Sequence, residues 1–208
     1  MDIAIAIIAA YLLGAIPFGF IIGKVFGKID IRQHGSGNIG ATNVSRVMGK
    51  KWWLPCFLLD MGKGLLPVAL AAIFFKDRYA QFPYHLIMIA LTIMPVIGHN
   101  WTCFLGFKGG KGVATSLGAV LGLCVSMPYL RFPLLLAAAT WGLLMLVFRL
   151  VSLGSISASA VFMLFCVFGA DVPNEFNILA VFIALFIVIR HQKNFAEIHA
   201  KFAKKSEK

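Results

Sequence analysis

The chain has 208 residues, of which 60% are hydrophobic and only 13% charged, with a mean hydropathy of +0.89 and a formal net charge of +11 at pH 7. A soluble domain carries about 25% charged residues, so this composition excludes an ordinary soluble protein and indicates an integral membrane protein. The apolar runs lack the strict alternation of a transmembrane barrel, so the predicted fold class is all-α.

The apolar runs predict about seven transmembrane helices, because about 20 apolar residues of helix cross a bilayer. The first run is preceded by Asp2 and by no Lys or Arg, which favours an uncleaved span over a signal peptide. The tight connection at Arg131 leaves a five- or six-span arrangement open. The expected spans cover residues 3–23, 58–75, 82–104, 113–130, 132–148, 156–170 and 176–189.

With seven spans, the basic residues fall mainly on one side of the membrane. The connecting segments 24–51, 108–112, 149–155 and 190–208 hold fifteen Lys and Arg residues, and the connections on the other side hold three. The positive-inside rule then places the rich side and the C-terminus in the cytoplasm and the N-terminus outside. This topology explains most of the net charge, so no nucleic-acid partner is expected. The basic face can hold anionic membrane lipid or anionic substrates.

The first polar cluster on the basic side is "HGSGNIGATNVSR", residues 34–46. It contains the G-x-G-x-x-G spelling of a dinucleotide site, but no βαβ unit surrounds it, which argues against a nicotinamide or flavin cofactor. Glycines instead allow backbone amides to approach an anion, especially where the loop feeds a helix N-terminus. Arg46 would add a fixed charge. A flexible turn that merely joins two spans is the alternative.

The second cluster is "GFKGGKGVAT", residues 106–115. It resembles a P-loop, but its first glycine is one residue too close to the Gly-Lys pair and Gly112 occupies the Ser/Thr position, which disfavours an ATPase. Lys111 can still supply a point charge beside a glycine-rich backbone and a helix N-terminus, so the segment is predicted to clamp a phosphate. The alternative is that its lysines only obey the positive-inside rule.

Further polar residues lie at the same membrane face. His99 is expected near the cytoplasmic end of the third span, and Ser155 lies in "RLVSLGS". His191 and Asn194 are three residues apart in "RHQKN", so a continuing helix would place them on one face. Within the second span, a local ion pair between Asp60 and Lys63 is the favoured interpretation.

The acidic residues are too scattered for a magnesium or zinc site, and the four cysteines form no C-x-x-C. No metal and no cofactor is therefore expected, and metal-dependent phosphotransfer is disfavoured.

The strings "GSGNIGATNVSR", "GHNWTCFLGFKGGKGVAT" and "RHQKN" closely resemble the three cytoplasmic motifs of the bacterial acyl-phosphate-dependent glycerol-3-phosphate acyltransferases. The resemblance extends over residues 11–195. The chain departs from the family at Thr102 and Cys103, where Pro-Val is frequent, and after Asn194. We interpret the first departure as a packing difference. Because of the second, no family role is carried over to residues after Asn194.

This resemblance implies one acyltransferase domain over residues 1–195 and a basic cytoplasmic tail over 196–208. The enzyme would lie in the bacterial inner membrane with its active site facing the cytoplasm. It would move a fatty acyl group from acyl phosphate to the 1-hydroxyl of glycerol 3-phosphate, giving lysophosphatidic acid and phosphate in the first step of phospholipid synthesis. A monomer would suffice.

The resemblance also implies roles for individual residues. The glycerol 3-phosphate is assigned to Lys111, Arg46, His191 and Asn194. The acyl phosphate is assigned, with Ser155 nearby, to Ser36, Gly37, Asn38, Gly40, Thr42 and Asn43. Further expected contacts are His99, Gly109, Gly110 and Gly112. The hydroxyl proton would pass to His191 or, as favoured here, to a phosphate oxygen of the donor.

A transporter and a structural membrane subunit are the two alternative classes of function. A transporter for an organic phosphate would explain the many spans and the basic mouth, but it needs polar groups near the middle of the membrane. A structural membrane subunit would leave the glycine-rich segments without a role.

Overall fold

The computed structural model describes residues 2–169, 171–196 and 198–199, and throughout these ranges the regular structure is helical. The chain divides into two compact units, Met1–Pro128 and Tyr129–Lys208, which are described separately. Unit 1 contains α1 Ile3–Ala15, α2 Phe18–Gly27, α3 Ala41–Met48, α4 Trp53–Phe75, α5 Gln81–Asn100 and α6 Val113–Leu123. Unit 2 contains α7 Arg131–Phe148, α8 Val151–Phe168 and α9 Asn174–Arg190.

Five segments of the described chain are long and apolar enough to cross a bilayer, namely Ile3–Gly27, Lys50–Phe75, Gln81–Leu105, Pro128–Phe148 and Val151–Phe168. The all-α architecture with several membrane-spanning helices is therefore confirmed. The two other expected spans are shorter helices, because α6 has 11 residues and α9 has 17. The number of seven spans stays a prediction.

The first expected span lies within the apolar segment Ile3–Gly27 but consists of two helices, and two other expected boundaries were wrong. The first span is not one continuous helix, since α1 ends at Ala15 and α2 begins after Pro17, whose ring removes a backbone donor. The connection between the fourth and fifth spans is the segment 124–130 and not Arg131 alone, because α6 ends at Leu123. The sixth span begins at Val151, so Ser155 lies inside α8 and not in a connection.

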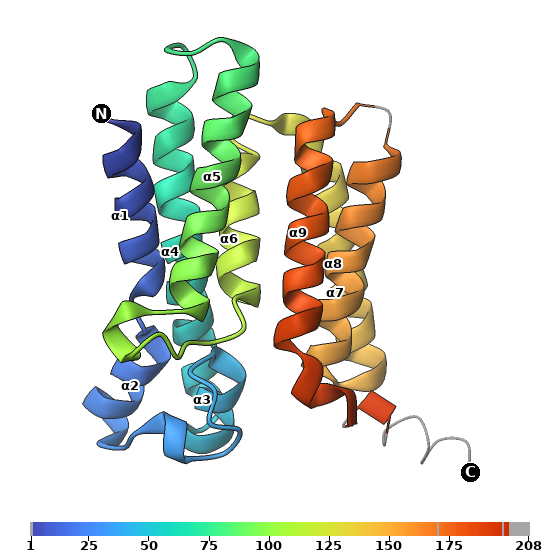
Figure 1. The fold of residues 1–208 in the computed structure, drawn as a ribbon. Coiled ribbons are helices and arrows are strands. Elements are labelled where there is room, and N and C mark those ends of the chain that lie inside the picture. Colours follow the sequence, from blue (N-terminus) through green and yellow to red (C-terminus); the bar gives the residue numbers. More distant parts are fainter. Residues whose placement is uncertain (1, 170, 197, 200–208) are drawn as a thin grey trace. The chain divides into compact units, whose positions relative to one another are not determined.

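Unit 1 is a bundle in which α4 packs on α6 and α1 packs on α5. The contact between α4 and α6 is close because it is made through glycine: a Cβ at Gly64 would collide with the carbonyl oxygen of Thr115, and one at Gly118 with that of Met61. Small residues at such crossings let helix backbones approach each other in membranes. Figure 1 shows the α4–α5 connection at one end of this bundle and α2, α3 and the α5–α6 connection at the other.

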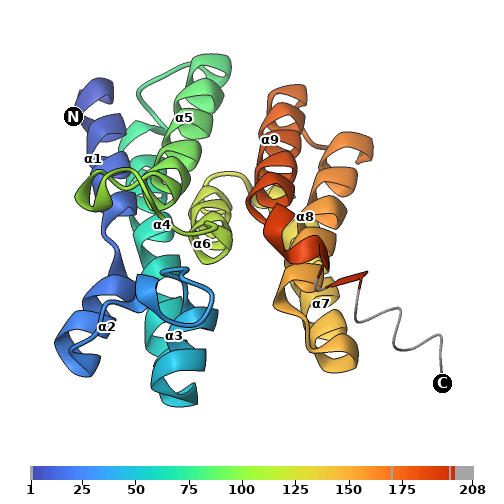
Figure 2. The ribbon, with the colours of Figure 1, turned by 60° about the horizontal axis from the view of Figure 1, so that its bottom comes forward.

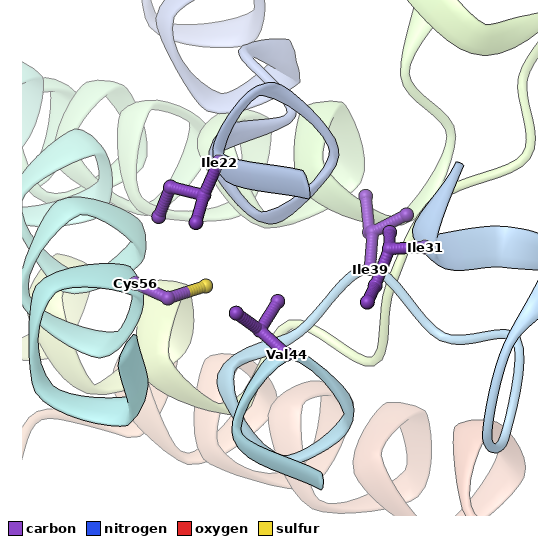
Figure 3. Close-up of a cluster of buried hydrophobic side chains, with 5 residues drawn as sticks. All are labelled: Ile22, Ile31, Ile39, Val44 and Cys56. Atoms are coloured by element: carbon purple, nitrogen blue, oxygen red, sulfur yellow. The ribbon is translucent and has the colours of Figure 1, made fainter. Parts of the chain in front are cut away.

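We call the second of these ends the loop end; it comprises residues 16–52 and 101–112. Figure 2 brings it forward and shows α2 and α3 beside α4, with which both are in contact. A buried apolar cluster holds these elements together, formed by Ile22, Ile31, Ile39, Val44 and Cys56 (Figure 3). Because its members come from α2, the 28–40 segment, α3 and α4, the cluster fixes the polar segments of the loop end to the bundle.

Unit 2 is a row of three helices in which α8 packs against both α7 and α9. Gly154 of α8 lies against the indole of Trp141 in α7, where a Cβ would be 3.1 Å from Cδ1. The predicted tail 196–208 lies outside the described residues except for positions 196, 198 and 199.

Candidate active site

The first glycine loop, residues 34–40, is organised from the inside by the buried side chain of Asn43. The two hydrogens of the Asn43 amide nitrogen are shared among three carbonyl oxygens, those of Ile31 at 3.2 Å, His34 at 3.1 Å and Asn38 at 2.8 Å. Its Oδ1 accepts from the backbone amide of Ser36 at 2.8 Å. Gly35 and Gly37 have φ of +62° and +70°, a left-handed conformation that glycine adopts without steric cost. Asn43 therefore shapes the loop.

Several backbone amides of this loop donate hydrogen bonds within the loop itself. Besides Ser36, Gly37 donates to the carbonyl of His34 at 3.1 Å, and Gly40 donates to Asn38 Oδ1 at 2.9 Å. The loop then enters α3, whose first amides, at Ala41 and Thr42, have no acceptor within the helix. A phosphate would therefore meet the donors of this helix N-terminus.

Thr42 and Arg46 lie four residues apart on α3, so they share one face of the helix. Both side chains are exposed, as is that of Ser36. The hydroxyl groups and the guanidinium are thus available at the surface of the loop end, next to the amides of the first turn.

Arg32 is a further cation close to this loop, but it is neutralised locally. Its Nη2 and Nε lie 2.7 Å and 2.9 Å from the two carboxylate oxygens of Asp30. Hydrogen bonding from this guanidinium lowers the pKa of Asp30 to about 2, and the same bond raises the pKa of Arg32. Arg32 is therefore not assigned to a substrate.

The second glycine loop, residues 106–112, folds back against the end of α5. The amide of Gly109 donates to the carbonyl of Asn100, and that of Gly110 to the carbonyl of His99, both at 3.1 Å. Gly112 has φ +76° and caps α6, where its carbonyl accepts from the amide of Ser116 at 2.7 Å. As a result, Lys111 lies just before the start of α6, and its side chain is half-buried.

The loop has no room for side chains where it crosses α5. A Cβ at Gly109 would collide with the carbonyl oxygen of His99, and one at Gly110 with His99 Nε2. A Cβ at Gly112 would lie 2.7 Å from Asn100 Nδ2. His99 and Asn100, both buried, thus form the floor on which the loop rests. Asn100 was not foreseen from the sequence, although its place beside His99 at the end of an apolar run could have suggested it.

The expected ion pair in α4 is present, with Lys63 Nζ 2.8 Å from Asp60 Oδ1. The structure adds a third member, because His99 Nδ1 lies 3.6 Å from the same oxygen. Lys63 also donates to the carbonyl oxygen of Ile16 at 2.6 Å, where α1 ends.

The remaining predicted residues belong to unit 2. Ser155 is buried in α8 and its hydroxyl donates to the carbonyl of Val151 at 2.8 Å, so its oxygen is left as an acceptor. The helix α9 ends at Arg190 and a 3₁₀ turn follows at Gln192–Asn194, so His191 and Asn194 do not lie on a continuing α-helix. Side chains three apart are eclipsed in such a turn, so this pair keeps a common side.

His191 is 2% exposed, and its Nδ1 lies 2.8 Å from the carbonyl oxygen of Ile187. Because a carbonyl can only accept, Nδ1 is the donor in this hydrogen bond.

Unit 1 therefore brings together both glycine loops and the residues assigned to them. Leu105, just before the second loop, packs on the apolar cluster that also anchors the first loop through Ile39. Thr102, a departure from the family pattern, is buried and donates to the carbonyl of Ala15 at 2.6 Å, as a packing role requires. Among the described residues, no three His, Cys, Asp or Glu side chains gather in a way that could hold a metal ion.

Known proteins match this chain over nearly its whole length. A family profile described as glycerol-3-phosphate acyltransferase matches residues 4–201. A glycerol-3-phosphate acyltransferase of Streptococcus pneumoniae (strain CGSP14) is 40% identical over 204 residues, covering 95% of this chain and 90% of the relative. The same name is given to a protein of Macrococcus caseolyticus that is 40% identical over 198 residues, covering 95% and 94%.

Two crystal structures of PlsY, an integral membrane glycerol 3-phosphate acyltransferase, have the same fold. The glycerol 3-phosphate form superposes with a TM-score of 0.82 at 38% identity and the lysophosphatidic acid form with 0.79 at 37%. Both matches cover 95% of this chain and 92% of the solved one. The sequence motifs, the helical membrane architecture and these matches agree, and the chain belongs to the glycerol-3-phosphate acyltransferase family of membrane acyltransferases.

Proposed function

We propose that the protein transfers a fatty acyl group from acyl phosphate to the 1-hydroxyl of glycerol 3-phosphate, giving lysophosphatidic acid and inorganic phosphate. The observation that carries the proposal is the pair of glycine loops at one end of unit 1, where Ile39 of the first loop belongs to the apolar cluster and Leu105, just before the second loop, packs on it. A reaction between two phosphate-bearing substrates requires two phosphate-binding sites, and each glycine loop can provide one. The glycerol 3-phosphate and lysophosphatidic acid forms of the solved relative fit this acceptor and this product.

The chemistry requires little from the protein beyond position and charge. Acyl phosphate is a mixed anhydride and is already activated. The 1-hydroxyl oxygen attacks the acyl carbonyl carbon, the bond from that carbon to the phosphate oxygen breaks, and the hydroxyl proton passes to the departing phosphate. Holding both substrates in register and stabilising negative charge are the main contributions expected of the site.

In this proposal the first glycine loop holds the acyl phosphate. The N-terminus of α3 would supply amide donors, and the exposed hydroxyls of Ser36 and Thr42 would add further donors. Asn43, whose polar atoms are engaged inside the loop, would act by keeping its shape, together with Gly37, Asn38 and Gly40.

The second glycine loop and Lys111 would bind the phosphate of glycerol 3-phosphate, with Arg46 as a second cation. We assign His191 and Asn194 to the glycerol moiety and Ser155 to the acyl phosphate side, as the resemblance implies. The donor's own phosphate would be the base, which is the substrate-assisted route.

We further propose that residues 1–195 act as one acyltransferase domain, functional as a monomer, in the bacterial inner membrane with the loop end facing the cytoplasm. The distribution of charge in unit 1 supports this orientation. The loop end carries eight Lys and Arg residues, whereas the α4–α5 connection at the other end carries Lys76 and Arg78.

The test is a comparison of acyl donors. Purified protein in lipid vesicles receives glycerol 3-phosphate with acyl phosphate, acyl-CoA or acyl carrier protein as the only donor, and lysophosphatidic acid is measured. Product from acyl phosphate alone is the expected result. Equal or faster product formation from acyl-CoA would overturn the assignment of the donor.

A further inference from the structure

A buried cluster of ionisable side chains lies beside the second glycine loop, and its members Asp60 and Lys63 have no part in the chemistry proposed above. Asp60 and Lys63 of α4 have side chains only 3% and 2% exposed, with 2.8 Å between carboxylate and ammonium. His99 of α5 is 4% exposed, and its Nδ1 lies 3.6 Å from the same Asp60 oxygen. Cys56 donates to the other carboxylate oxygen, with 3.9 Å from Sγ to Oδ2.

Such a cluster is not accounted for by stability alone. Charged side chains within membrane helices are costly to bury, and replacing a buried ion pair by apolar side chains of similar size is often neutral or stabilising. Lys63 is held by more than its partner, because it donates to the Ile16 carbonyl and lies 5.6 Å from the centre of the Phe18 ring. The carboxylate is therefore fixed at one point of the bundle, facing His99.

His99 links this fixed carboxylate to the second glycine loop. Its Nδ1 side faces Asp60, while its Nε2 lies where a Cβ of Gly110 would be. Its backbone carbonyl accepts from the amide of Gly110. The imidazole is thus packed between Asp60 and the loop that carries Lys111, so a rotation or shift of the ring moves the loop backbone.

We propose that Asp60 is a positioning residue: fixed by Lys63, it orients the His99 ring and so sets the place of the second glycine loop and of Lys111. The proposal rests on the proposed function, in which that loop binds glycerol 3-phosphate. It goes beyond it by adding Asp60 and Lys63, which lie in the core of the bundle and have no assigned substrate contact, to the residues that determine substrate binding. Weakening the cluster should therefore raise the KM for glycerol 3-phosphate and leave the KM for acyl phosphate unchanged.

The experiment measures both KM values for wild type, Asp60→Asn, Asp60→Glu and His99→Gln in lipid vesicles. Because Asp60→Asn leaves Lys63 buried beside a neutral amide, the double variant Asp60→Asn with Lys63→Met tests the same point without a stranded charge. We expect Asp60→Asn, the double variant and His99→Gln each to raise the KM for glycerol 3-phosphate about tenfold or more, since small displacements of a binding group are costly. Asp60→Glu should recover part of the loss.

His85→Gln is the matched control. His85 is also a buried histidine of α5, but it lies 14 residues earlier and hence about 21 Å along the helix at 1.5 Å per residue. This variant should keep both KM values, even where its melting temperature falls as much as that of His99→Gln.

A double-mutant cycle, made of Asp60→Asn, His99→Gln and the variant that combines them, tests whether Asp60 acts on the loop through the His99 ring. Positioning through the ring predicts that the combined variant raises the KM for glycerol 3-phosphate no more than the larger single effect. Fully multiplicative effects would overturn that path. Variants that lose active protein while every KM stays at the wild-type value would show a merely structural cluster and would overturn the proposal. Wild type that forms no lysophosphatidic acid from acyl phosphate would instead contradict the proposed function.

Discussion

Asn43 is a buried amide whose four hydrogen bonds all lie within residues 31–43. Lys111, by contrast, sits at the entry to α6, where both its own charge and the helix N-terminus favour an anion. Single substitutions can therefore test the shape of the first glycine loop, at Asn43, separately from the charge in the second loop, at Lys111.

Replacing Asn43 by Ala should leave the carbonyls of Ile31, His34 and Asn38 without their shared donor. Because unpaired buried polar groups cost about 1–3 kcal/mol, we expect a lower melting temperature together with a loss of turnover. Gln33→Ala, which removes an exposed amide from the neighbouring turn, is the control and should change neither. A stable and fully active Asn43→Ala protein would show that the loop is shaped by its glycines alone.

Replacing Lys111 by Ala should abolish most turnover without unfolding the protein. The loss of a cation aimed at a substrate phosphate is expected to lower kcat/KM by about a hundredfold or more. Lys108→Ala removes an exposed charge from the same loop and should lower it by less than about fivefold. Near-normal turnover of Lys111→Ala would remove this residue from the site.

At the scale of helices, Pro17 ends α1, and tertiary hydrogen bonds satisfy the carbonyls that this break leaves without a helical partner. The long apolar runs were sufficient to predict most helices and the position of both glycine loops. Pro17 indicates the break after α1, but the donors to the carbonyls of Ala15 and Ile16 could not be predicted, because Thr102 and Lys63 lie 87 and 47 residues away. The contact between Asp60 and His99 was missed for the same reason, since it joins two separate helices.

The contact between α4 and α6 gives a prediction about stability. Gly64→Ala would place a methyl group on the Thr115 carbonyl, so α4 and α6 must separate, and overpacking of this kind costs about 1–3 kcal/mol. Gly62→Ala, two residues away on the same helix, meets no atom within 4 Å and should be neutral or slightly stabilising. Melting temperatures of the two variants in the same detergent test this, and equal values would contradict a glycine-mediated contact.

At the scale of the whole molecule, the excess of Lys and Arg at the loop end predicts the orientation in the membrane. A cysteine introduced at Asp2 in a chain freed of its four native cysteines should react with a membrane-impermeant maleimide added to intact cells. A cysteine at Lys108, in the second glycine loop, should react only after the membrane is opened. The reverse pattern of labelling would contradict the proposed orientation.

We propose that two phosphate-bearing substrates meet at the loop end, where the acyl group passes from acyl phosphate to glycerol 3-phosphate. The most direct measurement is the release of inorganic phosphate and of lysophosphatidic acid by the purified protein in lipid, given acyl phosphate and glycerol 3-phosphate and no CoA. We predict that both products appear in a one-to-one ratio, and only when glycerol 3-phosphate is present. Phosphate release that does not depend on glycerol 3-phosphate, or no release above background, would contradict the account.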